Sequence, residues 1–112
     1  MSKKEIVTSE VHAPFGNYSA AVQKGNMLFI SGFGPFDANQ QLVGEGDIAA
    51  QTHLTMQNIK KTAEVAGFSM ADIVRSTVYL ADIKHWAVFN EIYGQYFEAP
   101  YPARCVVECK LN

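Results

Sequence analysis

The stretch from Asp47 to Ala66 constrains the fold most, because its apolar and small residues recur with helical spacing. One stripe contains Ile48, Thr52, Thr55, Met56, Ile59, Ala63 and Ala66. Asp47 stands where a side chain can accept hydrogen bonds from first-turn amides, and Gly67 stands where a left-handed residue commonly ends a helix. The pattern predicts a helix over residues 47–66 that buries one side against a core.

Five shorter segments, alternating or rich in β-branched residues, predict strands. They are residues 5–8, 18–23, 27–31, 73–80 and 103–110. Gly25 and Asn26 provide the turn of a hairpin between the second and third strands. A second helical stripe covers residues 85–97, with Asp82 placed to cap its start, and residues 69–72 have the spacing of a capping box. The order β-β-β-α-β-α-β predicts an α+β fold, with two helices packed on one face of a mixed sheet.

Length and composition predict a single domain over residues 1–112. A chain of 112 residues with 48% hydrophobic content can bury a sufficient core without disulfides or metal. The N-terminus has no apolar stretch of signal-peptide length, and no run approaches the ~18 apolar residues of a membrane span. We therefore expect a soluble, cytoplasmic protein that does not associate with membranes.

The cysteines, histidines and net charge argue against a disulfide between the two cysteines, a metal site and nucleic-acid binding. Cys105 and Cys109 lie about 13 Å apart in an extended strand, too far to form a disulfide with each other. The three histidines are scattered and show no metal-ligand spacing, so we expect no metal. The net charge of −2, without a concentrated basic face, argues against nucleic acid as a partner.

Arg104 is the first candidate functional residue, as one of only two arginines in the chain. It follows Pro102 at the start of the last predicted strand. Alternation places Arg104, Val106 and Glu108 on one face of that strand and Cys105, Val107 and Cys109 on the other. A guanidinium at a strand entrance can bind a small carboxylate or phosphate through two parallel hydrogen bonds. The alternative is an ordinary surface arginine.

Six ordered segments together resemble the YjgF/RidA family, also called the L-PSP endoribonuclease family, over about residues 13–111. They are Gly16-x-Tyr18-Ser19-x-Ala21-Val22, Phe29-Ile30-Ser31-Gly32, Gly46-Asp47-Ile48-x-x-Gln51-Thr52, Thr77-Val78-Tyr79-Leu80-x-Asp82, Asn90-Glu91-x-Tyr93 and Pro102-Ala103-Arg104-Cys105. The resemblance implies a chorismate-mutase-like homotrimer with clefts between subunits. It also implies hydrolysis of reactive 2-enamine or 2-imine acids, of the 2-aminoacrylate type, to 2-keto acids and ammonia, without a cofactor.

The same resemblance assigns roles to individual residues. Arg104 matches the arginine that holds the substrate carboxylate, and Tyr18 is the second expected catalytic residue. The expected substrate-binding positions are Ser31, Gly32, Phe33, Trp86, Asn90 and Cys105. Gly32 and Cys105 would contribute backbone groups, and Trp86 would form a wall. The implied partner is a small carboxylate-bearing imine, enamine or keto acid.

The chain departs from the family pattern at several positions. Asn17 and Ala20 stand where the family usually has proline and glutamine, and Phe33 replaces another glutamine, which makes one edge of the pocket more apolar. The sequence stops at Asn112, whereas relatives usually continue with a final strand that carries a glutamate implicated in activating water. Glu108 is no obvious substitute for that glutamate.

Two alternative functions remain open. One is the endoribonuclease activity after which the family is also named. The net negative charge and the lack of a histidine pair or metal cluster argue against phosphodiester cleavage. The other is a non-catalytic module that binds small keto or amino acids in the same cleft.

Overall fold

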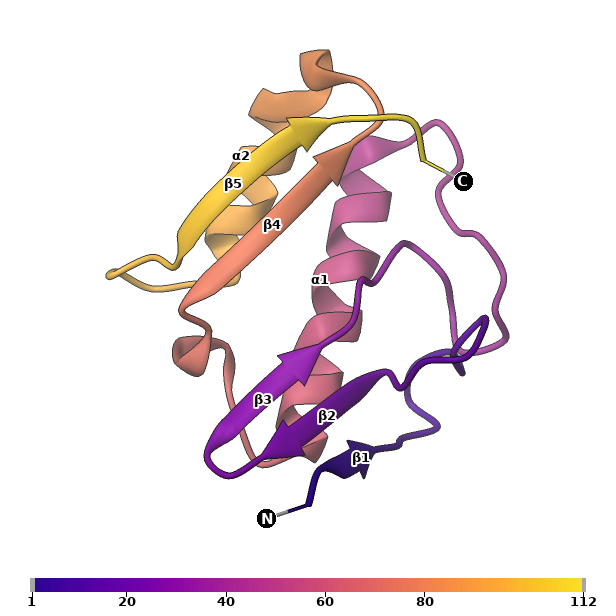
Figure 1. Ribbon diagram of the computed structural model, residues 1–112. Helices are drawn as coiled ribbons and strands as arrows, with labels where there is room; N and C mark the ends of the chain where they lie inside the picture. Colours follow the sequence, from indigo (N-terminus) through magenta and orange to yellow (C-terminus); the bar gives the residue numbers. More distant parts are fainter. Residues whose placement is uncertain (1, 112) are drawn as a thin grey trace.

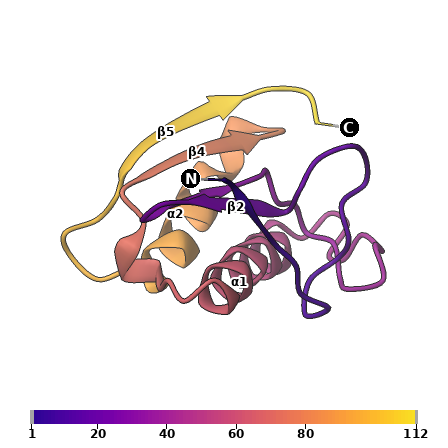
Figure 2. The ribbon, with the colours of Figure 1, turned by 60° about the horizontal axis from the view of Figure 1, so that its bottom comes forward.

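The computed structural model describes residues 2–111, with the strands lying on one side of two helices (Figures 1 and 2). In chain order the elements are β1 (Lys4–Ile6), β2 (Ala21–Lys24), β3 (Met27–Ile30), α1 (Ile48–Val65), η1 (Met70–Asp72), β4 (Arg75–Leu80), η2 (Ile83–His85), α2 (Trp86–Gln95) and β5 (Ala103–Glu108). The labels η1 and η2 denote single 3-10 turns. The α+β class, the element order and the packing of both helices on one face are as predicted.

The strands form two sheets instead of one continuous sheet. The first is antiparallel, in the order β1-β2-β3, and the second pairs β4 with β5 in parallel. The parallel pair arises because α2 carries the chain from the end of β4 back to the start of β5. The prediction of mixed strand directions is confirmed, but among residues 2–111 no strand pairing joins β3 to β4.

Local hydrogen bonds explain why some elements are shorter than predicted. Tyr18 donates its backbone N–H to Gly16 at 2.9 Å, and its hydroxyl accepts from the backbone N–H of Phe15 at 3.1 Å. This turn delays the start of β2 until Ala21. Ile73 donates to Met70 at 3.2 Å and closes η1, so β4 begins only at Arg75.

The second helix also begins differently from the prediction. The Asp82 carboxylate accepts from the backbone N–H of Lys84 at 3.0 Å and thereby caps η2, which runs directly into α2. That backbone hydrogen bond lowers the pKa of Asp82 below its ordinary value. The capping box at residues 69–72 is confirmed, because the Asp72 carboxylate accepts from the Ser69 N–H at 2.9 Å.

The hydrophobic core lies between the two helices and β4. Its buried members are Met56, Met70, Leu80, Phe89 and Tyr93. Next to it, Asn58 on α1 is buried and donates to the carbonyl oxygens of Gly34 and Phe36 at 3.2 and 3.0 Å. These two bonds satisfy the buried amide and tie the loop after β3 to the helix.

Both ends of α1 match the sequence prediction. The Asp47 side chain accepts from the backbone N–H of Ala50 at 3.1 Å, and Gly67 has a φ of +85° just beyond the last turn. We predict that Asp47→Ala lowers the free energy of unfolding by about 1 kcal/mol, because a first-turn N–H loses its acceptor. Urea denaturation measures this loss. Asp47→Asn, which keeps an acceptor oxygen, should restore most of the stability, and equal losses in both variants would contradict the capping role.

A candidate anion-binding site between α2 and β5

The guanidinium of Arg104 lies under β5, against α2. Arg104 is the second residue of β5, and its side chain faces the helices because strand residues alternate. Its Nη1 donates to Oδ1 of Asn90 on α2 at 2.9 Å. The predicted face of Arg104 is therefore confirmed. The side-chain amide of Asn90, a polar group on a mostly apolar helix, accepts a hydrogen bond from this guanidinium.

Three aromatic rings of α2 surround the same guanidinium. Its central carbon lies 4.8 Å from the ring centre of Tyr93, 5.8 Å from that of Phe89 and 6.0 Å from that of Trp86. A cation within about 6 Å of an aromatic ring is attracted to the negative face of that ring. Tyr93 is fixed in turn by a 2.7 Å hydrogen bond between its hydroxyl and that of Ser76 on β4. The rings and the amide together hold the arginine in one orientation.

An open cleft of about 740 Å³ lies beside Arg104. Its lining residues are Asn90, Glu91, Tyr93, Gly94, Gln95, Tyr101, Pro102 and Arg104. Sequence reasoning identified Arg104 and Asn90 but missed the other lining residues as parts of a site. A signal was available for two of them, since Tyr93 follows Asn90 by one helical turn and Pro102 belongs to the Arg104 motif.

The cleft carries a positive charge suited to binding an anion. A guanidinium has five N–H donors in a plane, and here one side-chain hydrogen bond, to neutral Asn90, is formed. Within residues 2–111, no carboxylate forms a salt bridge with Arg104. Glu91 lines the same cleft, so its carboxylate repels an anion on that side and favours binding directly at the Arg104 guanidinium. The remaining donors can bind a carboxylate in the plane of the guanidinium.

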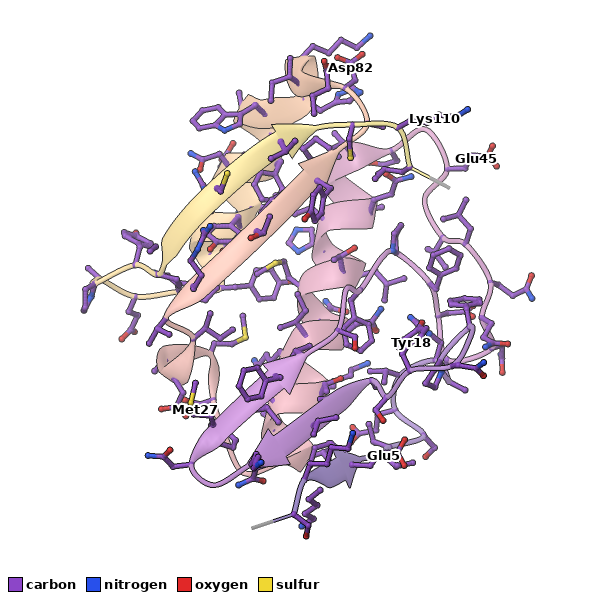
Figure 3. The ribbon with its side chains drawn as sticks, viewed as in Figure 1. Glu5, Tyr18, Met27, Glu45, Asp82 and Lys110 are labelled. Carbon is purple, nitrogen blue, oxygen red and sulfur yellow. The ribbon has the colours of Figure 1, made fainter. Side chains whose placement is uncertain are left out.

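The other predicted site residues do not line this cleft. Tyr18 precedes β2, in the loop region away from β5 (Figure 3). Ser31, Gly32 and Phe33 follow β3, and the Ser31 hydroxyl donates to the backbone of Ser19 at 2.6 Å. The expected site residues therefore form two groups, one in the loops that flank β2 and β3 and the other on α2 and β5.

Two residues beside Arg104 have different placements. Trp86 contacts the guanidinium but does not line the cleft, and the exposed Cys105 points to the opposite face of β5. Glu108, on the face of Arg104, accepts from the backbone N–H of Ile83 at 2.8 Å. This contact uses one carboxylate oxygen of Glu108 and ties the end of β5 to η2.

The structure also bears on metals and membranes. Within residues 2–111, no three His, Cys, Asp or Glu side chains are grouped so that they could hold a metal ion. Among the same residues, no helix is both long and apolar enough to cross a membrane.

The α+β fold places a fixed arginine beside an open cleft, an arrangement that can bind a small anion. The profile of the family described as Endoribonuclease L-PSP matches residues 8–111. A RutC family protein from Pyrococcus horikoshii is 42% identical, and the match covers 95% of this chain and 84% of that protein. The chain therefore belongs to the L-PSP endoribonuclease family, also called YjgF/RidA, as its motifs predicted.

Solved structures agree with this assignment. RidA from the Antarctic bacterium Psychrobacter sp. PAMC 21119 is 38% identical with a TM-score of 0.88, over 93% of this chain and 84% of that one. TdcF from E. coli, solved with bound serine, is 33% identical with a TM-score of 0.88, over 95% of this chain and 85% of that one.

Proposed function

We propose that this protein hydrolyses reactive 2-imino and 2-enamino acids, of the 2-aminoacrylate type, to 2-keto acids and ammonia. The observation that carries the proposal is the Arg104 guanidinium, which is fixed by Asn90 and is free of any carboxylate partner among the described residues. The relative TdcF, which binds serine, supports the proposal. Serine has a carboxylate next to a nitrogen-bearing carbon, and a 2-imino acid has the same arrangement.

In the proposed mechanism, positioning replaces a strong nucleophile. Arg104 binds the substrate carboxylate and holds the adjacent C=N carbon in the cleft. An enamine first takes a proton on its terminal carbon and becomes the imine. Water then adds to the C=N carbon, a proton moves to the nitrogen, and the C–N bond breaks to release ammonia and leave a C=O group. Because the carbon is already electrophilic, orientation of the water and proton transfer are sufficient.

A second copy of the chain completes the proposed site as part of a homotrimer. Tyr18, Ser31, Gly32 and Phe33 lie apart from Arg104 within a protomer, so a neighbouring protomer would bring them to the cleft. In that arrangement the Tyr18 hydroxyl would orient the water or the imine nitrogen. The helix-free face of the sheets offers the contact surface, because it exposes large apolar side chains. Its members include Met27, Phe29, Tyr79 and Val107, which are 57, 57, 57 and 38% exposed.

We predict that Phe29→Asp abolishes the trimer and lowers imine hydrolysis more than tenfold, because a buried, unpaired carboxylate opposes association. Light scattering after gel filtration measures the assembly, and circular dichroism checks that the protomer stays folded. Val74→Asp is the matched control, since Val74 is 80% exposed and belongs to no strand. An intact, active Phe29→Asp trimer would place the interface elsewhere.

A coupled assay tests the activity itself. Threonine dehydratase supplies 2-iminobutyrate, and the release of 2-ketobutyrate is followed under conditions where hydrolysis of the imine limits the rate. We expect a rate above that of buffer, proportional to the amount of this protein. A rate equal to that of buffer would reject the deaminase proposal.

The alternatives predict other outcomes. A binding module would take up 2-ketobutyrate in calorimetry without accelerating hydrolysis. An endoribonuclease would cleave RNA after exhaustive purification and lose that activity on Arg104→Ala.

A further inference from the structure

Gln40 has a left-handed backbone conformation, with a φ of +63°, which residues other than glycine rarely adopt. It lies in a turn of the loop between β3 and α1, where the Asp37 carboxylate accepts from the backbone N–H groups of Asn39 and Gln41 at 2.9 and 3.0 Å. Glycine adopts this conformation without strain, so a glutamine here indicates a role for the side chain.

The side chain of Gln40 reaches a second loop, which lies between β1 and β2. Its Nε2 donates to the carbonyl oxygen of Ala13 at 3.0 Å and, less closely, to that of Pro14 at 3.5 Å. These acceptors lie 27 and 26 residues earlier in the chain. Because both carbonyls come just before Phe15, the amide of Gln40 fixes the backbone that leads into Phe15.

A cluster of aromatic rings holds the same segment. The ring centre of His12 lies 4.9 Å from that of Phe15 and 5.4 Å from that of Phe33. The ring centre of Phe15 lies a further 4.9 Å from that of Phe36. Nδ1 of His12 donates to the carbonyl of Ala13 at 2.8 Å, since a carbonyl oxygen can only accept. The backbone before Phe15 and the ring of Phe15 are therefore both held by other parts of the protomer.

Phe15 in turn fixes the hydroxyl of Tyr18. The backbone N–H of Phe15 donates to the Tyr18 hydroxyl oxygen at 3.1 Å. A tyrosine hydroxyl that accepts this bond can still donate its own hydrogen to another group. Tyr18 is 43% exposed, so the group that receives this hydrogen can lie outside the protomer.

We propose that Gln40 is a positioning residue, which fixes the Tyr18 hydroxyl as a hydrogen-bond donor through the loop that precedes Tyr18. This inference rests on the proposed function, in which Tyr18 orients water or the imine nitrogen in the cleft of a neighbouring protomer. Arg104, and not Tyr18, binds the substrate carboxylate in that mechanism. Loss of the Gln40 amide should therefore lower kcat and leave KM nearly unchanged.

Gln40→Met tests this effect, because methionine has a similar length but no amide donor. In the coupled keto-acid assay, kcat should fall about three- to tenfold, as expected for the loss of one hydrogen bond, while KM stays within about twofold. Gln41→Met is the matched control, since the exposed side chain of Gln41 donates to the nearby carbonyl of Asn39 at 3.4 Å and should not affect kcat. Equal losses in the two variants would overturn the proposal.

Gln40→Gly separates positioning from stability. Glycine relieves the left-handed backbone, so the midpoint of thermal denaturation should lie at or above that of Gln40→Met. Because glycine also lacks the amide, kcat should fall as far as in Gln40→Met. A glycine variant with the kcat of the wild type would show that the amide of Gln40 has no part in the reaction.

A double-mutant cycle tests whether Gln40 acts through Tyr18. Tyr18→Phe keeps the ring and removes the hydroxyl. In the Tyr18→Phe background, Gln40→Met should lower kcat by less than about twofold, because the group that it positions is already absent. A further three- to tenfold loss in this background would show that Gln40 acts by another route.

The Phe15 amide reports on the position of Tyr18 without any imine hydrolysis. By NMR, its hydrogen exchange should become about three- to tenfold faster in Gln40→Met and should stay at the wild-type rate in Gln41→Met. The ring signals of Tyr18 should shift in the first variant alone. A wild-type protein that does not accelerate hydrolysis would reject the proposed function, and faster Phe15 exchange would even then support the role of Gln40. Unchanged Phe15 exchange and Tyr18 signals in Gln40→Met would reject that role whatever the activity.

Discussion

Arg104→Ala is expected to lower kcat/KM for imine hydrolysis by about 100-fold or more, because the substrate carboxylate loses two charge-assisted hydrogen bonds. Such bonds contribute about 1.5–3 kcal/mol each, and about 1.4 kcal/mol corresponds to a factor of ten in rate. Arg104→Lys should lie between the wild type and the alanine variant, since an ammonium keeps the charge but cannot form the planar pair. The coupled keto-acid assay measures all three proteins.

The only other arginine provides the matched control. Arg75 is exposed, and its Nη1 donates to the neighbouring backbone carbonyl of Ser76 at 2.8 Å instead of facing the cleft. We expect Arg75→Ala to keep kcat/KM within about twofold of the wild type. Gel filtration and thermal denaturation check that both variants fold and assemble alike. Equal losses in the two variants would show that general charge, and not the position of Arg104, supports the reaction.

Asn90 is expected to act as a positioning residue through Arg104. Its amide oxygen fixes one nitrogen of the guanidinium at 2.9 Å. Because Asn90→Ala leaves the charge in place but frees its orientation, the variant should bind 2-ketobutyrate more weakly than the wild type and more tightly than Arg104→Ala. A merely structural role for Asn90 would lower thermal stability and leave the affinity of the folded protein unchanged.

Phe89→Ala is expected to lower the free energy of unfolding by about 3–5 kcal/mol, the usual cost of deleting a buried aromatic ring. Phe89 is 5% exposed and lies 5.4 Å from Tyr93, ring centre to ring centre, within the core between the helices and β4. For a chain of this size the midpoint of thermal denaturation should fall by about 12 °C or more.

Val88→Ala tests whether burial causes that loss. Val88 is the neighbouring residue on α2, but it is 44% exposed, so its truncation should cost less than about 1 kcal/mol. Urea denaturation of both variants gives the comparison. If the two variants unfold at the same urea concentration, the core does not extend under α2 as described.

The sequence predicted those features that depend on neighbouring residues. The bounds of α1 followed from its stripe, from the capping side chain of Asp47 and from the freedom of Gly67 to adopt a positive φ. The face of β5 that carries Arg104 followed from simple alternation. In each case the residues that produce the feature lie only a few positions from the feature itself.

Features that depend on distant segments were not predicted. The late start of β2 results from the bond between the Phe15 N–H and the Tyr18 hydroxyl, which no strand propensity encodes. The break between β3 and β4 depends on which strands become neighbours after α1 and α2 have packed. Likewise, Gln95 and Tyr101 line the cleft because the segment after α2 lies beside Arg104.

The sequence by itself thus determined the order of the elements, the caps of α1 and the side of β5 from which Arg104 projects, because periodicity and capping act over a few residues. Only the tertiary structure decided that Asn90 and the rings of α2 hold the guanidinium, and that the described strands form two sheets. These arrangements bring together residues far apart in the chain, and packing against a shared core sets their distances.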